Sequence, residues 1–375
     1  MTTIRLDHPA AGIVTLRPDG APTALDAAPA LDTLVLEVTG GHLTWSLLAG
    51  QRLPAATLDD TEAAQDWLWA VYGENTALAV ADDEGHHRDL TATPARPELV
   101  IALHRLAYAH WASRWWPAST VESIPALDQA ALAKEIAELS EVCETVVSGA
   151  DDHSAASLGG QLTTGSGGAF ARDEQSGTHH PGQAPNSGHP DELAPARGRE
   201  ASPRDGRAED YALAAGGETS GTGPALASGD GDWDWRCCPP GLVDAGARSV
   251  SWQVRRGGGV TTVVVSAVAA PDCPRTVPVH LLPMARLRTA DSPAEIPLSR
   301  RGDAWIGELR TPAAIQNLVS VAVFVPGVGP VGPPTDESPL RESIREHIRL
   351  RLAGAQQDIP LLAVELAAAD NDSDY

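Results

Sequence analysis

The stretch that decides how this chain folds runs from residue 150 to residue 232. It includes DDHSAASLGGQLTTGSGGAF (151–170) and THHPGQAPNSGHPDELAPARGRE (178–200). It holds 16 of the 35 glycines, has no Trp, Ile or Val, and has a net charge of −8 from 13 acids and 5 arginines. A segment with so little apolar surface cannot offset the entropy lost on ordering it. We therefore predict a disordered linker over 150–232. With an end-to-end distance of roughly 50 Å, this linker would tether the two flanking domains. Whether the two domains touch each other stays open.

The segment before the linker, residues 1–149, carries 21 acids and 8 bases and alternates in hydropathy like strands at first. Short runs near 3–6 and 12–16 predict strands, and 34–48 predicts a hairpin around Gly40-Gly41. The expected helices comprise one over 62–71 capped by Thr57 or Asp59, one over 97–116 opened by Pro97, and one over 128–147. Residues 77–80 are a further candidate strand. We predict an acidic, tryptophan-rich α+β domain.

The segment after the linker is richer in β-branched residues. Runs at 250–254, 260–268, 277–282, 305–309 and 319–325 are separated by Gly and Pro clusters, which is typical of a small antiparallel sandwich over 233–330. Residues 331–368 then predict a C-terminal helical segment, with helices at 339–352 and 359–368. Residues 369–375 predict an acidic, disordered tail. The fold class is therefore an α+β domain, a long disordered linker and an all-β domain followed by a helix.

Composition excludes several classes of function. The chain has 375 residues and a net charge of −23, which argues against binding nucleic acid, since that needs a basic face to neutralise phosphates, and against binding to an anionic membrane. No run approaches 18 apolar residues and the N-terminus shows no signal peptide, so we expect a cytoplasmic protein without a membrane segment. Lys134 is the only lysine among 27 basic residues, a bias typical of a GC-rich, actinobacterial genome.

Familiar catalytic and nucleotide-binding motifs do not fit. Residues 327–332 read G-x-G-x-x-G, but prolines follow where a dinucleotide site needs a helix N-terminus. The sequence contains no P-loop and no G-x-S-x-G nucleophile elbow. Cys143 lies on an apolar helical stripe and is expected to be a core residue. We predict no catalytic residue, no cofactor and no metal.

Two sets of histidines form the alternative to that prediction. His86 and His87 lie among carboxylates in a polar turn, and His104 and His110 share the helix over 97–116. Either set could serve a metal-dependent hydrolase or a metal-binding domain, although a solvated turn and helix packing are the simpler interpretations. Cys237, Cys238, Cys273 and His280 could also be considered for zinc. Adjacent cysteines rarely reach one tetrahedral ion together, so buried thiols are expected there.

Tryptophan is the most unusual component. The chain has 10 Trp against 2 Phe and 4 Tyr, and several occur in clusters. Within each cluster the helical spacing sends side chains to different faces, and exposed tryptophans are enriched at binding hot spots. Packing in the core is the competing interpretation. The candidate partner-binding residues are Trp67, Trp69, Trp111, Trp115, Trp116, Trp233 and Trp235.

The stretch RLAYAHWASRWWPASTVESIPALDQAALAKEIAEL (105–139) resembles uncharacterised actinobacterial proteins that accompany MoxR-type AAA+ ATPases in multi-gene defence systems. The resemblance covers about 35 residues, and its motif has no assigned chemistry. It implies an accessory subunit without ATPase activity of its own, and it assigns no catalytic residue.

These observations favour a non-enzymatic adaptor that binds other proteins, among them an AAA+ ATPase, with the linker raising the effective concentration between two binding events. The alternative is a metal-dependent hydrolase or metal-binding domain that uses one of the two histidine sets. A third interpretation is an effector or substrate of a neighbouring enzyme, cut between Asp151 and Asp232.

Overall fold

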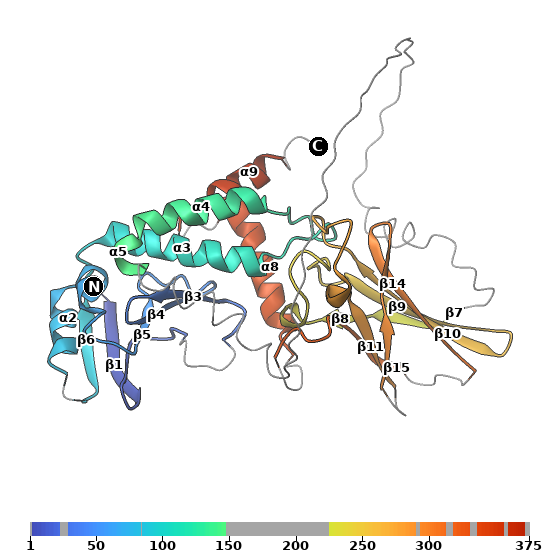
Figure 1. The fold of residues 1–375 in the computed structure, drawn as a ribbon, viewed down its shortest axis with the longest axis horizontal. Coiled ribbons are helices and arrows are strands. Elements are labelled where there is room, and N and C mark those ends of the chain that lie inside the picture. Colours follow the sequence, from blue (N-terminus) through green and yellow to red (C-terminus); the bar gives the residue numbers. More distant parts are fainter. Residues whose placement is uncertain are drawn as a thin grey trace, which may run out of the picture.

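The computed structural model describes residues 2–22, 29–83, 85–147, 225–289, 293–312, 318–330, 336–355 and 359–371. Most of the predicted linker, and residues 372–375 of the predicted tail, lie outside these ranges. The described residues form an N-terminal unit of one sheet with helices, a C-terminal unit of two sheets, and a helix that packs between them (Figure 1). The predicted fold class is confirmed.

The N-terminal sheet is antiparallel throughout, with strand order β3-β4-β5-β2-β1-β6. Its strands are β1 (Thr2–Ala10), β2 (Ile13–Pro18), β3 (Thr33–Val38), β4 (Gly41–Ser46), β5 (Ala55–Leu58) and β6 (Arg88–Ala92). The predicted hairpin is confirmed: β3 and β4 pair across a turn in which Gly40 has a φ of 78°. Glycine adopts that conformation without the steric cost of a Cβ.

Five helices accompany this sheet. They are α1 (Gln65–Tyr72), α2 (Glu74–Ala81), α3 (Pro97–Trp115), α4 (Gln129–Val142) and α5 (Glu144–Val147). Helix α3 lies between the sheet and α4, and its buried side chains face both (Figure 1). Asp128 lies just before α4 and not inside the helix as predicted, and it caps α4 by accepting hydrogen bonds from two backbone N–H groups.

Two local predictions for this unit are wrong. Thr57 cannot cap α1 because it belongs to β5, and the side chain of Asp60 caps the turn that precedes α1 instead. Residues 77–80 are helical and not a strand. Helix α2 buries Thr76, Ala77 and Val80 at helical spacing. Its alanines favour a helix, which begins after Gly73 has ended α1.

The C-terminal unit is a sandwich of a five-stranded sheet, β13-β14-β10-β9-β7, and a four-stranded sheet, β12-β11-β15-β8. The strands are β7 (Ala225–Asp230), β8 (Asp232–Trp233), β9 (Val250–Gly257), β10 (Val260–Val268), β11 (Met284–Thr289), β12 (Pro293–Pro297), β13 (Ser299–Arg301), β14 (Ala304–Thr311) and β15 (Leu318–Phe324). All pairs are antiparallel except β15 with β8. Short turns η1 (Trp235–Cys237) and η2 (Val279–Leu281) complete it.

Two boundaries of the C-terminal prediction need correction. Residues 225–232 were assigned to the linker, yet β7 pairs with β9 over five residues and β8 begins at Asp232. Residues 225–230 form a strand because they pair with β9, and the composition of these residues alone does not indicate that pairing. The predicted strand at 277–282 is a loop around η2, because prolines at 274, 278 and 283 interrupt ladder pairing.

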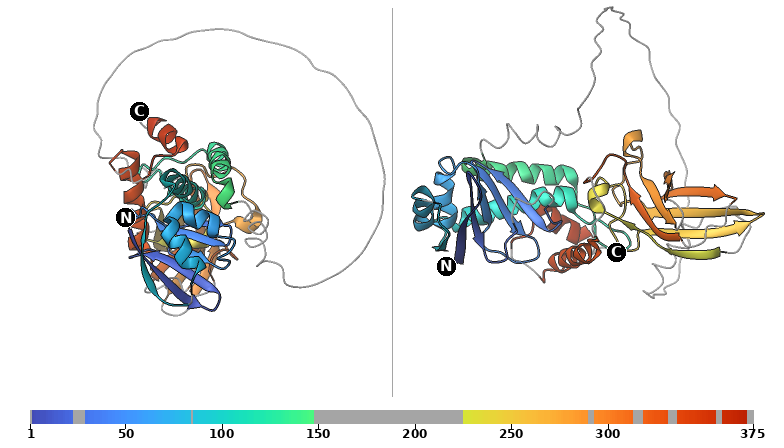
Figure 2. Two further views of the ribbon diagram at one scale, coloured as in Figure 1. Left: turned by 90° about the vertical axis from the view of Figure 1, so that its left-hand side faces the viewer. Right: turned by 90° about the horizontal axis from the view of Figure 1, so that it is seen from below.

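The last two helices, α8 (Ser338–Leu352) and α9 (Ala363–Asn371), return the chain to the N-terminal unit. Helix α8 runs between the two units and α9 packs on α4 (Figures 1 and 2). Both predicted helices are confirmed, although α9 extends into the predicted tail. The question of contact between the units is thereby settled: they pack against each other.

Candidate functional site

Buried charged side chains lie at the junction between the two units, and Asp244 is one of them. This carboxylate is fully buried and accepts hydrogen bonds from the Ser119 hydroxyl at 2.7 Å, from the Thr120 N–H at 2.7 Å and from its hydroxyl at 2.9 Å. The Gly246 N–H donates a fourth hydrogen bond at 2.8 Å. A backbone bond from Ala245 N–H to the Ala118 carbonyl lies alongside. Asp244 therefore joins the loop after α3 to the sandwich.

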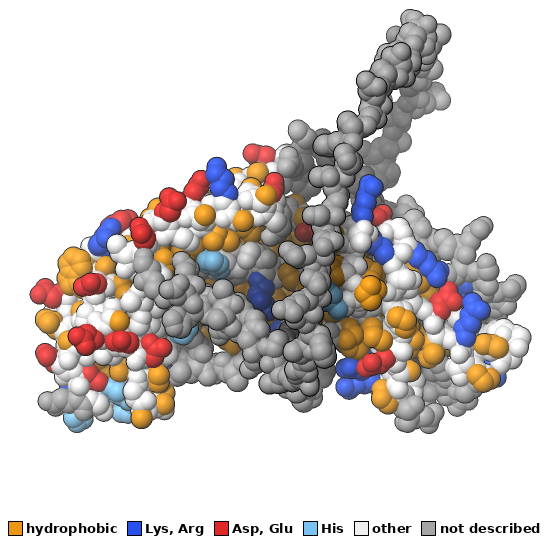
Figure 3. Space-filling model, viewed as in Figure 1, with side chains coloured by type: hydrophobic (Ala, Val, Ile, Leu, Met, Phe, Trp, Pro, Cys, Tyr) orange, Lys and Arg blue, Asp and Glu red, His pale blue; other side chains and the backbone are white. Residues whose placement is uncertain are grey.

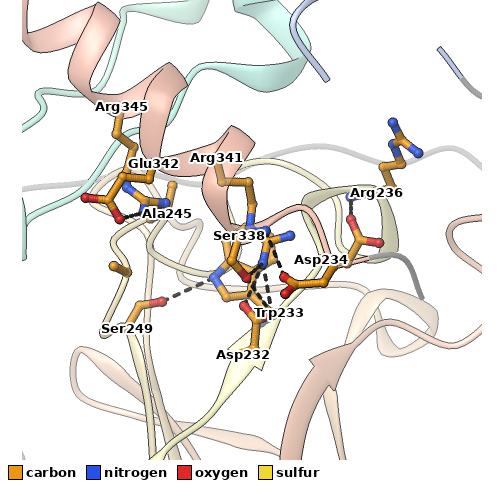
Figure 4. Close-up of polar contacts among 12 residues, drawn as sticks. Asp232, Trp233, Asp234, Arg236, Ala245, Ser249, Ser338, Arg341, Glu342 and Arg345 are labelled. Atoms are coloured by element: carbon orange, nitrogen blue, oxygen red, sulfur yellow. Dashed lines mark hydrogen bonds and ion pairs between the residues drawn. The ribbon is translucent and has the colours of Figure 1, made fainter. Parts of the chain in front are cut away.

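Helix α8 brings arginines to the same junction (Figure 4). Arg341 is 4% exposed, and its guanidinium contacts both carboxylate oxygens of Asp232 at 2.8 and 2.9 Å and the Ser338 hydroxyl at 3.0 Å. At the start of the helix, Glu337 pairs with Arg236 at 3.0 Å. Arg236 also donates to the Pro29 carbonyl of the N-terminal unit at 2.6 Å. The first turn of α8 thus contacts β8 and η1 of the sandwich.

One turn further along, Arg345 connects all three parts. It is 4% exposed, pairs with Glu122 of the N-terminal unit at 3.1 Å and donates to the Ala245 carbonyl of the sandwich at 3.2 Å. Glu122 also pairs with Arg349 and accepts from the Ala247 N–H at 2.6 Å. Burial lowers the pKa of Arg345, and the neighbouring Glu122 opposes that shift.

The C-terminal end of α8 reaches a second buried pair. Arg351 and Glu365 are 2% and 0% exposed and make two hydrogen bonds, at 2.7 and 2.9 Å. The Tyr108 hydroxyl of α3 donates to Glu365 at 2.6 Å, and the guanidinium of Arg351 lies 4.5 Å from the centre of the Tyr108 ring. Burial, and then Glu365, raise the pKa of Tyr108 well above its usual value.

A neighbouring carboxylate holds α9 on α4. Glu135 of α4 accepts from the Ala363 N–H at 2.9 and 3.0 Å, at the N-terminus of α9, and from Arg105 at 3.1 Å. A carboxylate at a helix N-terminus satisfies donors that have no partner within the helix. Together with the Arg351–Glu365 pair, this contact fixes both C-terminal helices on α3 and α4.

These groups hold the elements around the junction in place. Each buried carboxylate named here accepts from an arginine, a hydroxyl or backbone N–H groups at hydrogen-bonding distance, and no thiol or hydroxyl nucleophile is paired with a histidine base in this set. Sequence reasoning missed the whole junction. The arginines at 341, 345 and 349 recur every four residues, a pattern that is typical of a solvent-exposed helix face.

Within the first histidine set, the structure gives His87 a carboxylate partner from a distant strand. His87 pairs with Asp7 of β1 at 2.7 Å and its side chain is 74% exposed, and His86 is exposed. His8 contacts Asp83, and the His8 and His87 rings are 6.4 Å apart. Sequence spacing gave no signal for Asp7 and His8, since β1 lies about 80 residues earlier. Across the described ranges no three or more His, Cys, Asp or Glu side chains are placed to hold a metal ion.

The second histidine set is not brought together. His104 is 8% exposed and stacks on the Trp45 ring at a centroid distance of 5.1 Å, whereas His110 is exposed. Desolvation, with Arg351 as a second cause, lowers the pKa of His104 to about 4. His104 is therefore neutral at neutral pH and acts as an aromatic packing residue.

The folded-state pKa of His104 predicts a dependence of stability on pH. Since its ordinary value near 6.5 applies to the unfolded chain, the unfolded state binds the proton more tightly. Above pH 6.5 the titration of His104 does not lower the free energy of unfolding. As the pH drops towards 4, protonation of the unfolded state lowers the free energy of unfolding by about 3 kcal/mol. Urea unfolding of the wild type and of His104→Phe at pH 7 and pH 4.5 isolates the contribution of His104 to the pH dependence, because phenylalanine keeps the stacking without titrating. An equal pH dependence in both proteins would contradict the assignment.

Three of the four cysteines, Cys143, Cys238 and Cys273, are buried, and Cys237 is half-buried. Desolvation raises the pKa of Cys143 to about 11 and that of Cys238 to about 12, so both are protonated at neutral pH. Burial also raises the pKa of Cys237 and of Cys273. Gly327 and Gly329 of the G-x-G-x-x-G stretch form a turn after β15, and residues 331–335 lie outside the described ranges.

The candidate partner-binding tryptophans are mostly interior. Five of them are 8% exposed or less: Trp67, Trp111, Trp116, Trp233 and Trp235. The indole N–H groups of the first four of these donate to backbone carbonyls at 2.7–3.1 Å, as buried tryptophans require. Trp115 is half-buried beneath Arg114, and Trp69 is 46% exposed. These five side chains therefore pack in the interior of the described fold, and Trp69 and Trp115 are the candidates that reach its surface.

Comparison with protein-family models, with curated proteins and with solved structures finds no match to this chain. No helix in the described part of the chain is both long and apolar enough to span a membrane.

Proposed function

We propose that this chain is a non-enzymatic, cytoplasmic adaptor that holds two partner proteins in a fixed relative orientation. The observation that carries the proposal is the junction around α8. Arg341, Arg345 and Arg351 are nearly fully buried, and their acidic partners come from the sandwich, the N-terminal unit and α9. Buried ion pairs add little net stability compared with apolar packing, and in some proteins they select one geometry over others. Such a junction suits a protein whose task is to fix an orientation.

The two units offer different surfaces to partners. Residues 1–149 carry a net charge of −13, whereas residues 225–330 carry nine acids and ten arginines. Figure 3 displays this contrast, with acidic side chains spread over the N-terminal unit and arginines over the sandwich. A strongly acidic unit and a nearly neutral one favour two chemically different partners. One of them, in this proposal, is an AAA+ ATPase of a multi-protein bacterial defence system.

The test is affinity capture with the tagged full-length chain from its native host, followed by mass spectrometry and metal analysis of the same eluate. The adaptor predicts two different proteins in one complex. Arg310→Glu on the sandwich should release one of them and Asp66→Arg on α1 the other, since both side chains are exposed on opposite units. Capture of no protein, together with a stoichiometric metal ion, would overturn the adaptor in favour of the histidine alternative.

A further inference from the structure

The end of the N-terminal unit formed by α1 and α2 carries an exceptional run of negative charge. Residues 59–83 contain seven acids and no Lys, Arg or His. Six of these carboxylates are exposed: Asp59, Asp60, Glu62, Asp66, Glu74 and Asp82. Among the residues that the structure describes, none of the six forms an ion pair. Their negative potential is therefore not neutralised within the described fold.

Two large apolar side chains stand among these acids. Trp69 of α1 is 46% exposed and Leu78 of α2 is 54% exposed. In α2, Glu74, Leu78 and Asp82 follow one another at four-residue spacing and so share one face, with the leucine between two carboxylates. In α1, Trp69 lies three residues after Asp66 on the same face. Each helix thus presents one apolar side chain flanked by acids.

The position of these helices leaves their outer faces open. Helices α1 and α2 pack on each other across Gly73 and lie at the end of the molecule opposite the sandwich (Figures 1 and 2). Figure 3 shows acidic side chains gathered over this end with apolar ones among them. The other six tryptophans of the clustered set are buried or half-buried. An exposed tryptophan framed by charge is typical of a binding hot spot.

We propose that the acidic apolar surface of α1 and α2, made of the six carboxylates with Trp69 and Leu78, docks a basic amphipathic helix of a partner protein. Its arginines or lysines would pair with the carboxylates, and its apolar stripe would cover Trp69 and Leu78. A second copy of the chain fits less well, because two molecules of net charge −23 repel each other. The inference deepens the proposed function by naming the chemistry of one partner.

The test measures binding of a fluorescein-labelled helical peptide of roughly 18 residues, with leucines at i, i+4 and arginines on both flanks, to the full chain by fluorescence anisotropy. We expect saturable binding that weakens at high salt. Trp69→Ala should raise Kd by about tenfold or more. Asp66→Asn combined with Glu74→Gln should raise it about fivefold and reduce its salt dependence.

Matched variants separate this surface from general charge attraction. Ile101→Ser removes another exposed apolar side chain, 48% exposed on α3, and Glu138→Gln with Glu141→Gln removes two exposed carboxylates from α4. Both should leave Kd within about twofold. Equal weakening by these controls, or binding that does not saturate, would overturn the proposal. So would a dimer in sedimentation that Trp69→Ala dissociates, because the surface would then serve self-association.

The outcomes also separate this inference from the adaptor itself. A chain that captures two proteins from lysate but ignores the peptide keeps the proposed function and refutes the basic helix as occupant. A chain that binds the peptide through Trp69 but captures no protein keeps the surface and refutes the adaptor.

Discussion

Replacing Asp244 with alanine is expected to lower the free energy of unfolding by about 3–5 kcal/mol. The carboxylate is fully buried, and the Gly246 N–H and the Ser119 hydroxyl that donate to it are buried as well. Without an acceptor these two donors stay buried and unsatisfied, at a cost of roughly 1–3 kcal/mol each, whereas the N–H of the exposed Thr120 can turn to water. Urea unfolding measures the loss, and hydrogen exchange should show residues 118–122 opening first.

Two further variants sharpen that experiment. Asp244→Asn keeps the shape but retains only one acceptor oxygen, so we expect an intermediate loss. Asp272→Ala removes an exposed carboxylate from a turn of the same unit and should change stability by less than about 0.5 kcal/mol. A loss of stability for Asp244→Ala no larger than that of Asp272→Ala would mean that Asp244 does not hold the two units together.

Replacing Glu365 with alanine is expected to cost about 3–5 kcal/mol, because it leaves Arg351 as a buried cation without a counter-charge. The Tyr108 hydroxyl and the Leu362 N–H lose their acceptor in the same step. The double variant Glu365→Leu with Arg351→Met should be more stable than Glu365→Ala alone, since apolar side chains can replace a buried pair. Thermal and urea unfolding of the three proteins measure the effect.

The matched control for this pair is an exposed one on the same helix. Glu346 and Arg349 pair at 3.1 Å with side chains 56% and 38% exposed, so Glu346→Ala should cost less than about 1 kcal/mol. If Glu365→Ala were as mild as Glu346→Ala, the buried pair would not anchor α8 and α9 on α3.

Local patterns in the sequence were sufficient for the fold class. Helix α3 follows from Pro97 and a long apolar stripe, and α4 follows from its own apolar stripe, because these signals act within one or two turns. Strands β9 and β10 follow from β-branched runs. Strand β7 could not be predicted, since its Ala-Leu-Ala-Ser-Gly-Asp composition resembles the linker and only pairing with β9 makes it a strand.

The candidate site was out of reach of sequence reasoning for a different physical reason. Asp244 meets Ser119 across 125 residues, and Glu365 meets Tyr108 across 257, so no spacing rule links them. The sequence also could not predict which tryptophans are buried. Trp67 and Trp69 are two residues apart on one helix, yet their side chains are 2% and 46% exposed. Periodicity predicted that they face different sides but not which side is covered.

The return of the chain from the sandwich to the N-terminal unit has a consequence for synthesis on the ribosome. Tyr108 is made 257 residues before its partner Glu365, which at roughly 5–20 residues per second is a delay of about 10–50 s. During that interval the faces of α3 and α4 that later receive α8 and α9 remain uncovered in the nascent chain. Completion of the N-terminal unit therefore waits for the translation of α8 and α9, and this unit is most open to chaperones and proteases before that moment.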